Sequence, residues 1–175
     1  MLRDPQSARV EMVRRSLARL GVGGTPPALA AEIAHRYCEL RDGRMALVDG
    51  AVALLERLRA AGASLALVTN GGARSQRPKI DRFDLARHFD HIQIEGEFGA
   101  GKPDASVYDA ALGALGVKAA DATFIGDDLE CDVRGPLRAG MQAVWIDITS
   151  DGLPTGHAAR PRRIIRSVAD LHDEL

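Results

Sequence analysis

The first forty residues show the hydrophobic pattern of two amphipathic helices. Between positions 7 and 20, apolar residues recur at three- and four-residue steps: Val10, Val13, Leu17 and Leu20. A second segment opens at the prolines in positions 26 and 27 and repeats the pattern with Leu29, Ile33, Tyr37 and Leu40. Such steps line one face of an α-helix, and the glycines between the segments end the first helix. We expect two antiparallel helices over residues 6–41.

Beyond Gly50 the pattern changes to short apolar runs that alternate with helical segments. The expected strands are 65–68, 92–94, 123–125, 143–146 and 164–165. The expected helices are 51–61, 104–115, 131–139 and 168–175. Short apolar strands between amphipathic helices are typical of a parallel sheet that helices cover on both faces. The predicted fold class is α/β, with a doubly wound parallel sheet in residues 47–175 and a separate helical unit in residues 1–46.

Composition and charge narrow the possible classes of function. Of 175 residues, 46% are hydrophobic and 27% are charged, which is the profile of a soluble globular protein. The formal net charge is −1 without a dense basic block, so nucleic-acid binding is unsupported. The apolar runs are far shorter than the roughly 20 residues that cross a bilayer. Cys38 and Cys131 lie far apart without metal-type spacing, and no N-terminal segment resembles a signal peptide; both features favour a cytoplasmic location.

The sharpest chemical signal is a cluster of carboxylates directly after the expected strand 123–125. Asp127, Asp128, Glu130 and Asp132 fall within six residues. At roughly 5 Å and an effective dielectric constant near 20, each like-charged pair costs about 3 kcal/mol, so the cluster is expected to bind a cation, spread into water or protonate. Oxygen ligands suit Mg²⁺. A solvated acidic turn that caps the following helix explains the cluster alone equally well.

Two further loops carry candidate anion-binding groups. Thr69, Asn70, Gly71 and Gly72 follow the expected strand 65–68, and in an open parallel sheet ligands bind beyond the carboxyl ends of the strands. A threonine hydroxyl and backbone N–H groups at a helix N-terminus suit an anion, although a plain turn is the commoner meaning of such residues. Lys102 lies in a Gly-Lys-Pro-Asp loop, and a lone lysine of this kind is usually a surface residue.

Taken together, these three loops resemble those of the haloacid dehalogenase (HAD) superfamily of hydrolases. The stretches LALVTNGG, GAGKPD and FIGDDLECD are similar, in order and spacing, to the second, third and fourth motifs of that superfamily. The resemblance covers the chain from about Leu47 to Leu175, and the flanking segments are similar to those of phosphatases with a helical cap. It implies a Mg²⁺-dependent phosphomonoester hydrolase that acts on a small phosphorylated metabolite, with residues 1–46 as part of the cap.

The resemblance also implies which residues handle phosphate. Thr69 and Lys102 would be catalytic: the Thr69 hydroxyl binds a phosphate oxygen, and the Lys102 ammonium neutralises the phosphoryl oxygens and holds the nucleophile in place. Asn70, through its backbone N–H, and Gly71 would bind the substrate with them.

The carboxylates after strand 123–125 would form the metal site by the same resemblance. Asp127 would ligate Mg²⁺ directly, and Asp128 and Asp132 would support the metal shell. Such a site stabilises a transferring phosphoryl group electrostatically.

One motif of the superfamily is missing from the sequence. The reaction uses a DxDx(T/S) motif after the first strand, whose first Asp attacks phosphorus and whose second acts as general acid and base. The only early candidate, Asp4-Pro5-Gln6-Ser7, has Gln in place of the second Asp and no apolar strand before it. In the family this strand lies between the strands that bear Thr69 and Asp127. We therefore expect a sheet without its first strand, and we expect that a segment carrying the motif precedes Met1.

Two other interpretations remain open. A non-catalytic relative would keep these motifs in order to bind a phosphorylated ligand or a partner protein without turnover. An unrelated doubly wound domain, such as a receiver-type signalling module, fits poorly, because receivers lack this order of Thr, Lys and paired Asp motifs. The pattern predicts neither the natural substrate nor the oligomeric state.

Overall fold

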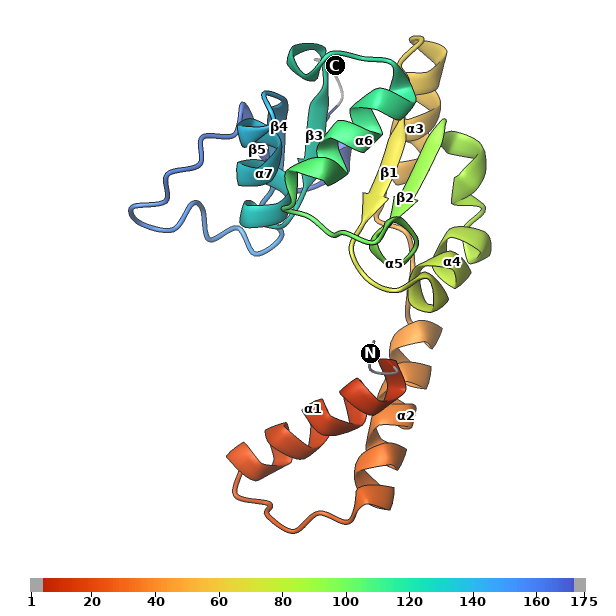
Figure 1. The fold of residues 1–175 in the computed structure, drawn as a ribbon, viewed down its shortest axis with the longest axis vertical. Helices are drawn as coiled ribbons and strands as arrows, with labels where there is room; N and C mark the ends of the chain where they lie inside the picture. Colours follow the sequence, from red (N-terminus) through yellow and green to blue (C-terminus); the bar gives the residue numbers. More distant parts are fainter. Residues whose placement is uncertain (1–4, 172–175) are drawn as a thin grey trace. The chain divides into compact units, whose positions relative to one another are not determined.

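The computed structural model describes residues 5–171 of the chain. The chain divides into two compact units, Met1–Ala46 and Leu47–Leu175, whose helices and strands are labelled in Figure 1. Within the described residues, no helix is both long enough and apolar enough to cross a membrane.

The first unit is a pair of helices, α1 (Pro5–Arg19) and α2 (Pro27–Gly43), close to the predicted positions. They run in opposite directions and splay apart toward the loop that connects them (Figure 1). The buried residues of α2 are small, Ala30 and Ala34. Its large apolar residues share one face, as predicted, but each is between 38% and 56% exposed: Leu29, Ile33, Tyr37 and Leu40. The apolar stripe therefore predicted the helix but not the surface through which it packs.

The second unit alternates strands and helices. Its strands are β1 (Ala66–Thr69), β2 (His91–Ile94), β3 (Thr123–Gly126), β4 (Gln142–Ile146) and β5 (Arg163–Ile165). Its α-helices are α3 (Ala51–Ala60), α4 (Ala73–Arg82), α5 (Glu95–Phe98), α6 (Ala105–Leu115) and α7 (Gly135–Arg138). Short 3₁₀ turns occupy Leu85–His88, Ala119–Asp121 and Val168–Asp170. All five predicted strands are present.

Two of the predicted helices differ from what the structure shows. The expected helix 131–139 is a π-helical turn (Leu129–Arg134) followed by the four residues of α7. Gly135 and Pro136 lie at the junction of the two, and a side chain at Gly135 would collide with the hydroxyl of Tyr108. The expected helix 168–175 is a 3₁₀ turn over its first three residues, and positions 172–175 lie outside the described residues. The sequence pattern had also not predicted α4 and α5.

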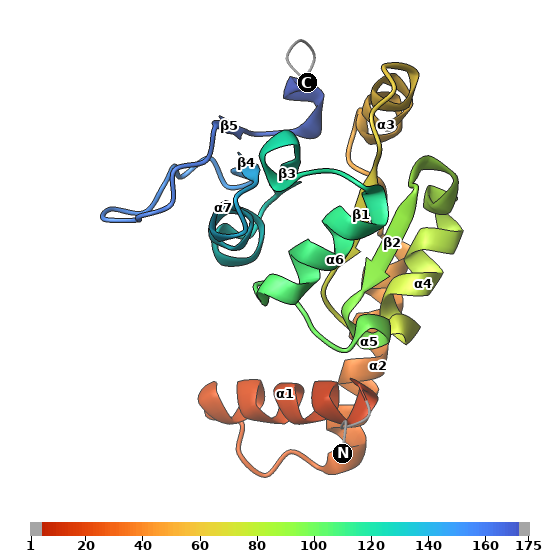
Figure 2. The same cartoon turned by 45° about the horizontal axis from the view of Figure 1, so that its top comes forward.

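The strands form two parallel sheets rather than one. β1 pairs with β2, from Ala66 opposite His91 to Thr69 opposite Ile94. β4 lies between β3 and β5 and pairs in parallel with both. Within the described residues no strand joins β1 to β3, so each sheet has an open inner edge; Figure 2 shows the two groups of strands, with α6 between them in this view. The α/β class with parallel strands is confirmed, and β1 and β3, between which the resemblance places a further strand, have not paired with each other.

The hydrophobic core of this unit lies around β4. Its residues Ala143, Val144 and Trp145 are buried in succession. Val144 packs in one cluster with Leu54, Ile165 and Leu171, and its two neighbours pack in another with Val133 and Ala159. By contrast, every residue of β1 and β3 is only partly buried, although strands in such folds are usually covered on both faces. The incomplete burial follows from the open inner edges.

Candidate functional site

The loop after β1 turns the chain into α4 and is held by several hydrogen bonds. Gly71 has a φ of 111°, a conformation that glycine adopts without steric cost. The carbonyl of Asn70 accepts a hydrogen bond from Gln76 Nε2 at 2.8 Å, and the N–H of Gly71 donates to Glu95 Oε2 at 2.6 Å. The hydroxyl of Thr69 donates to the carbonyl of Asn70 at 3.3 Å. Gly71, which the resemblance assigned to substrate binding, therefore has its N–H already bonded to Glu95.

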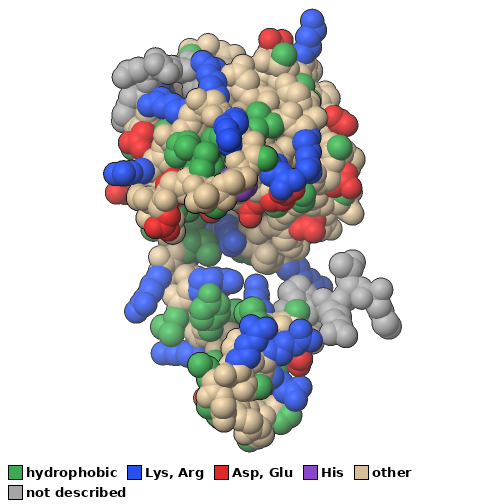
Figure 3. Space-filling model, turned by 90° about the vertical axis from the view of Figure 1, so that its left-hand side faces the viewer, with side chains coloured by type: hydrophobic (Ala, Val, Ile, Leu, Met, Phe, Trp, Pro, Cys, Tyr) green, Lys and Arg blue, Asp and Glu red, His purple; other side chains and the backbone are tan. Residues whose placement is uncertain are grey.

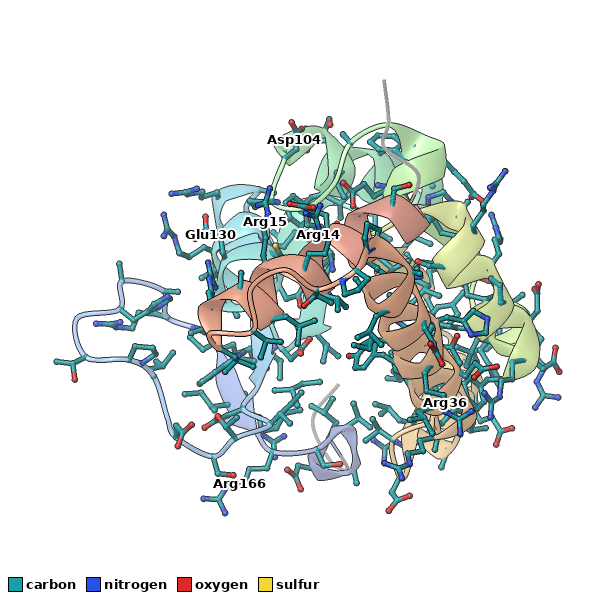
Figure 4. The ribbon with its side chains drawn as sticks, turned by 90° about the horizontal axis from the view of Figure 1, so that it is seen from below. Arg14, Arg15, Arg36, Asp104, Glu130 and Arg166 are labelled. Carbon is teal, nitrogen blue, oxygen red and sulfur yellow. The ribbon has the colours of Figure 1, made fainter. Side chains whose placement is uncertain are left out.

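The Gly-Lys-Pro-Asp loop is bonded to this loop. Asn70 Nδ2 donates to the carbonyl of Lys102, and Asn70 Oδ1 accepts from the N–H of Lys102, both at 2.8 Å. Cys131 Sγ, from the loop after β3, lies 3.4 Å from the same carbonyl. Asp104, labelled in Figure 4, caps the start of α6 by accepting from the N–H of Ser106 at 2.9 Å. These bonds hold Lys102 between the carboxyl ends of β1 and β3.

The side chain of Lys102 forms a buried ion pair with Asp132. The distance from Lys102 Nζ to Asp132 Oδ1 is 2.7 Å, and the two side chains are 10% and 7% exposed. The ammonium lies 5.0 Å from the centre of the Phe124 ring, within the range of a cation–π contact. Asp132 reaches this position because Gly126 has no side chain, since a Cβ there would collide with the Asp132 carboxylate. Neither charge is well solvated, so each depends on the other.

The carboxylates after β3 are engaged mainly within their own loop. Asp128 Oδ1 accepts from the backbone N–H of Glu130 at 2.9 Å and of Cys131 at 2.7 Å. These hydrogen bonds, that of Cys131 foremost, lower the pKa of Asp128. Asp132 Oδ2 accepts from the N–H of Asp128 at 3.1 Å, and Glu130 pairs with Arg134 at 2.8 Å. Asp128 therefore caps the turn that follows it, which was the simpler interpretation of the cluster.

The carboxylate of Asp127 is exposed and, unlike those of Asp128 and Asp132, is not hydrogen-bonded within the loop. Its carbonyl accepts from Trp145 Nε1 at 2.9 Å, while its side chain has no hydrogen bond or ion pair to any described residue. Over residues 5–171, no three His, Cys, Asp or Glu side chains are grouped so that they could hold a metal ion. The expected ligands Asp127, Asp128 and Asp132 are thus neighbours that do not form a ligand cluster here. Their role in binding Mg²⁺ stays a prediction.

Direct bonds join five of the predicted site residues: Thr69, Asn70, Lys102, Asp132 and Asp128. The sequence analysis missed two residues that hold the loop after β1, Gln76 and Glu95. Glu95 stands immediately after β2, so the rule applied to β1 and β3, that chemistry gathers just beyond strand ends, would have found it. Gln76 lies inside α4, where nothing in the sequence pattern distinguishes it.

Charged side chains are distributed differently over the two units in the view of Figure 3. On the face of the α/β unit that Figure 3 shows, acidic and basic side chains are interspersed. In the same view, the charged side chains of the helical unit are mainly Arg, and they lie around apolar side chains.

Comparison with known proteins agrees with the motif resemblance. The sequence matches the haloacid dehalogenase-like hydrolase family over residues 10–140. Phosphoserine phosphatase of Thermus thermophilus is 42% identical over 124 residues, which are 71% of this chain and 49% of that protein. N-acylneuraminate-9-phosphatase of Rattus norvegicus is 35% identical over 144 residues, which are 82% of this chain and 57% of that protein. The chain spans about half the length of these curated relatives.

A solved structure shows the same fold. A HAD phosphatase from Thermococcus onnurineus superposes with a TM-score of 0.70 at 25% sequence identity. The match covers 94% of this chain and 87% of that one.

Proposed function

Since the chain belongs to the haloacid dehalogenase-like hydrolase family, we propose that its site serves the Mg²⁺-dependent hydrolysis of a small phosphorylated metabolite. One observation carries this proposal. Lys102 is bonded at once to Asn70, after β1, and to Asp132, after β3. A cation held between two loops at the carboxyl ends of parallel strands suits a phosphoryl group. The relatives named above as phosphatases of phosphoserine and of N-acylneuraminate 9-phosphate support the substrate class.

In this proposal the chain's own residues act by positioning and by charge. The Thr69 hydroxyl turns from the Asn70 carbonyl to donate to a phosphate oxygen, which it can do because its present bond is long, at 3.3 Å. The backbone of Asn70 adds a second donor to the same group. Lys102 supplies a positive charge that is already held in place, so little reorganisation is needed when negative charge develops on the phosphoryl oxygens.

The carboxylates suit a magnesium ion that keeps most of its water. Mg²⁺ is commonly bound through one or two carboxylates and retains several waters, and the exposed, uncommitted Asp127 suits the direct ligand. Asp128 is bonded to backbone N–H groups, and Asp132 is bonded to Lys102. These two carboxylates would support the shell around the ion rather than ligate it directly. When bound, the ion would help to neutralise the phosphate oxygens.

The first unit and the cellular location complete the proposal. We assign residues 1–46 to a helical cap, whose usual task is to close over the substrate. The exposed apolar face of α2 suits a surface that meets another part of a protein or a ligand.

We place the reaction in the cytoplasm, because the two cysteines are both free and such thiols are typical of reducing compartments. Nucleic acid and membrane are not among the proposed partners.

Hydrolysis of p-nitrophenyl phosphate tests this function. The 175-residue polypeptide would be compared, with and without Mg²⁺, with a version carrying an apolar strand and a DxDx(T/S) motif ahead of Met1. We expect turnover only in the extended version and only with Mg²⁺, because only that version carries the first Asp of the motif, which attacks phosphorus. In the extended version Asp127→Asn is expected to abolish the metal-dependent activity. Clear turnover by the 175-residue polypeptide would show that the chemistry does not need the motif.

A non-catalytic relative is the alternative function. It would bind a phosphorylated ligand or a partner protein at the same residues. Phosphate binding without turnover, even in the extended version, would favour this alternative over the hydrolase.

A further inference from the structure

Three loops meet at the backbone of Lys102. Its N–H and carbonyl are both bonded to the side chain of Asn70, 32 positions earlier in the chain, at 2.8 Å. The carbonyl is also approached by Cys131 Sγ at 3.4 Å. The loop after β1 and the loop after β3 are therefore joined through the main chain of one residue, at the end of the two sheets that share no strand pairing.

The bond pattern at Asn70 is one that few side chains can make. A carboxamide offers an acceptor and a donor side by side, and it meets the acceptor and the donor of a single residue's backbone. A carboxylate lacks the donor, and a hydroxyl is too short to reach both groups. Asparagine at position 70 therefore supplies both the donor and the acceptor that the two hydrogen bonds to Lys102 require.

A turn residue is the simplest other explanation of Asn70, because Asn tolerates positive φ better than most residues. The backbone excludes this explanation. The positive φ in this loop belongs to Gly71, at 111°, and the non-glycine residues with positive φ in the described part of the chain are Asp84 and Ser150. Asn70 is thus present for its side chain rather than for its backbone conformation.

The ammonium of Lys102 depends on where its backbone is held. Lysine has four rotatable side-chain bonds and loses much rotamer freedom when it is fixed. At its far end the ammonium pairs with Asp132 at 2.7 Å and lies 5.0 Å from the Phe124 ring centre, and both partners belong to the β3 side of the unit. Asn70 fixes the near end to the β1 side.

We infer that Asn70 is a positioning residue that acts through Lys102: its side chain holds the lysine backbone so that the ammonium stays paired with Asp132 at the rim of both sheets. That this ammonium meets a phosphoryl group rests on the proposed function. The hold of the Asn70 side chain on the Lys102 backbone, called the clamp below, does not rest on the proposed function. It is tested first, without any phosphate.

The first experiment follows Lys102 by NMR in the 175-residue chain. We compare the wild type with Asn70→Ala, which removes both bonds, and with Gln76→Ala, which removes one bond to the same loop without touching Lys102. The exchange rates of the Lys102 amide proton and ammonium protons with water are measured. Two lost hydrogen bonds are expected to raise both rates roughly tenfold or more in Asn70→Ala, with less than about a twofold change in Gln76→Ala. Unchanged rates in Asn70→Ala, or equal changes in the two variants, would overturn the inference.

A thermal melt separates this effect from a general loss of structure. If Asn70→Ala melts as the wild type does while its ammonium exchanges faster, the side chain acts on Lys102 and not on folding. If the variant does not fold, Asn70→Asp, which keeps the acceptor for the Lys102 N–H and lacks the donor, replaces it. That variant is expected to protect the amide and to release the ammonium, and protection of both groups would contradict the inference.

A second arm then tests the link to function with inorganic phosphate and Mg²⁺, followed on the Thr69 and Lys102 amide signals. If the wild type binds and Asn70→Ala binds roughly tenfold more weakly, both proposals are supported. If the wild type does not respond to phosphate, the proposed function fails, while the clamp stands or falls by the exchange rates alone. Equal affinity in both proteins would show that the clamp has no part in binding the anion.

Discussion

At the scale of single residues, neighbouring carboxylates in one loop serve different purposes. Asp127 is exposed and its side chain is uncommitted among the described residues, Asp128 caps a turn, and Asp132 is buried against Lys102. The sequence predicted that such a cluster would bind a cation, spread into water or protonate, because like charges at this spacing repel. It did not show which carboxylate would pair, since the partner lies 30 positions away and becomes a neighbour only through the fold.

The buried ion pair gives a prediction about stability. Asp132→Ala leaves the Lys102 ammonium buried without its partner, so we expect a loss of about 3 kcal/mol or more in the free energy of unfolding. Asp127→Ala, the matched control in the same loop, is expected to change it by less than about 0.5 kcal/mol, as at an ordinary surface position. Urea unfolding followed by the fluorescence of Trp145 measures both values in the α/β unit. Similar losses in the two variants would show that the pair does not carry the stability assigned to it.

Cys131 gives a prediction about reactivity. Burial, with the neighbouring Asp128 as the next cause, raises the pKa of its thiol to about 11, so at pH 8 only about one molecule in a thousand carries the thiolate, against roughly one in four for an ordinary cysteine near 8.5. The higher intrinsic nucleophilicity of such a thiolate offsets part of this difference. We expect the folded Cys38→Ser variant to react with iodoacetamide at least tenfold more slowly at pH 8 than the same variant in urea.

The pH profile checks the cause of that slow reaction. Because the thiolate population of a group with a pKa near 11 still grows at pH 10, the rate for the folded protein is expected to rise nearly tenfold per unit from pH 8 to 10. For the unfolded chain the rate should level off above pH 9. A plateau near pH 9 in the folded protein would mean that steric access, and not the pKa, limits the reaction.

At the scale of elements, the hydrophobic pattern identified those in which apolar residues recur regularly along the sequence and missed those that contain few apolar residues. α6, which buries Val107, Tyr108, Ala111 and Leu112, was predicted to within a residue. α4 was missed because it buries only Ile80 and contains Pro78, which the pattern treats as a helix breaker. The predicted helix boundaries near Gly135 were wrong for another reason. The close approach of Tyr108 to Gly135 is a tertiary contact, which no local sequence pattern contains.

The open sheet edges give a prediction about hydrogen exchange. In a strand with one neighbour, alternate backbone N–H groups point away from the ladder, and those without a partner exchange quickly. We therefore expect fast and slow amides to alternate along β1 and β3, and all amides of β4, which has neighbours on both sides, to be slow. Exchange measured residue by residue by NMR tests this. Uniform protection along β1 and β3 would mean that the inner edges are covered.

At the scale of the whole molecule, the two units of the chain differ in how much apolar surface their cores bury. The α/β unit has two buried hydrophobic clusters around β4. The helical unit has helices of 15 and 17 residues, buried positions in α2 that are occupied by alanine, and a stripe of large apolar residues left exposed. Helices of this length are marginal in water unless packing supports them. The sequence predicted a boundary near residues 46–50, but hydrophobic spacing could not reveal this difference, because it records that a face is apolar and not whether anything covers it.

Separate expression of the two units tests this asymmetry. We expect residues 47–175 alone to fold and to show a free energy of unfolding, followed through Trp145, within about 0.5 kcal/mol of the value in the full chain, since their core is self-contained. We expect residues 1–46 alone to show weak helical circular dichroism that fades gradually on heating, because contacts through Ala30 and Ala34 remove little apolar surface from water. A sharp cooperative melt of residues 1–46 would show that the small contact suffices. Failure of residues 47–175 to fold would show instead that the larger unit needs the helices, and the division of the chain into a stable core and a dependent helical pair would then be wrong.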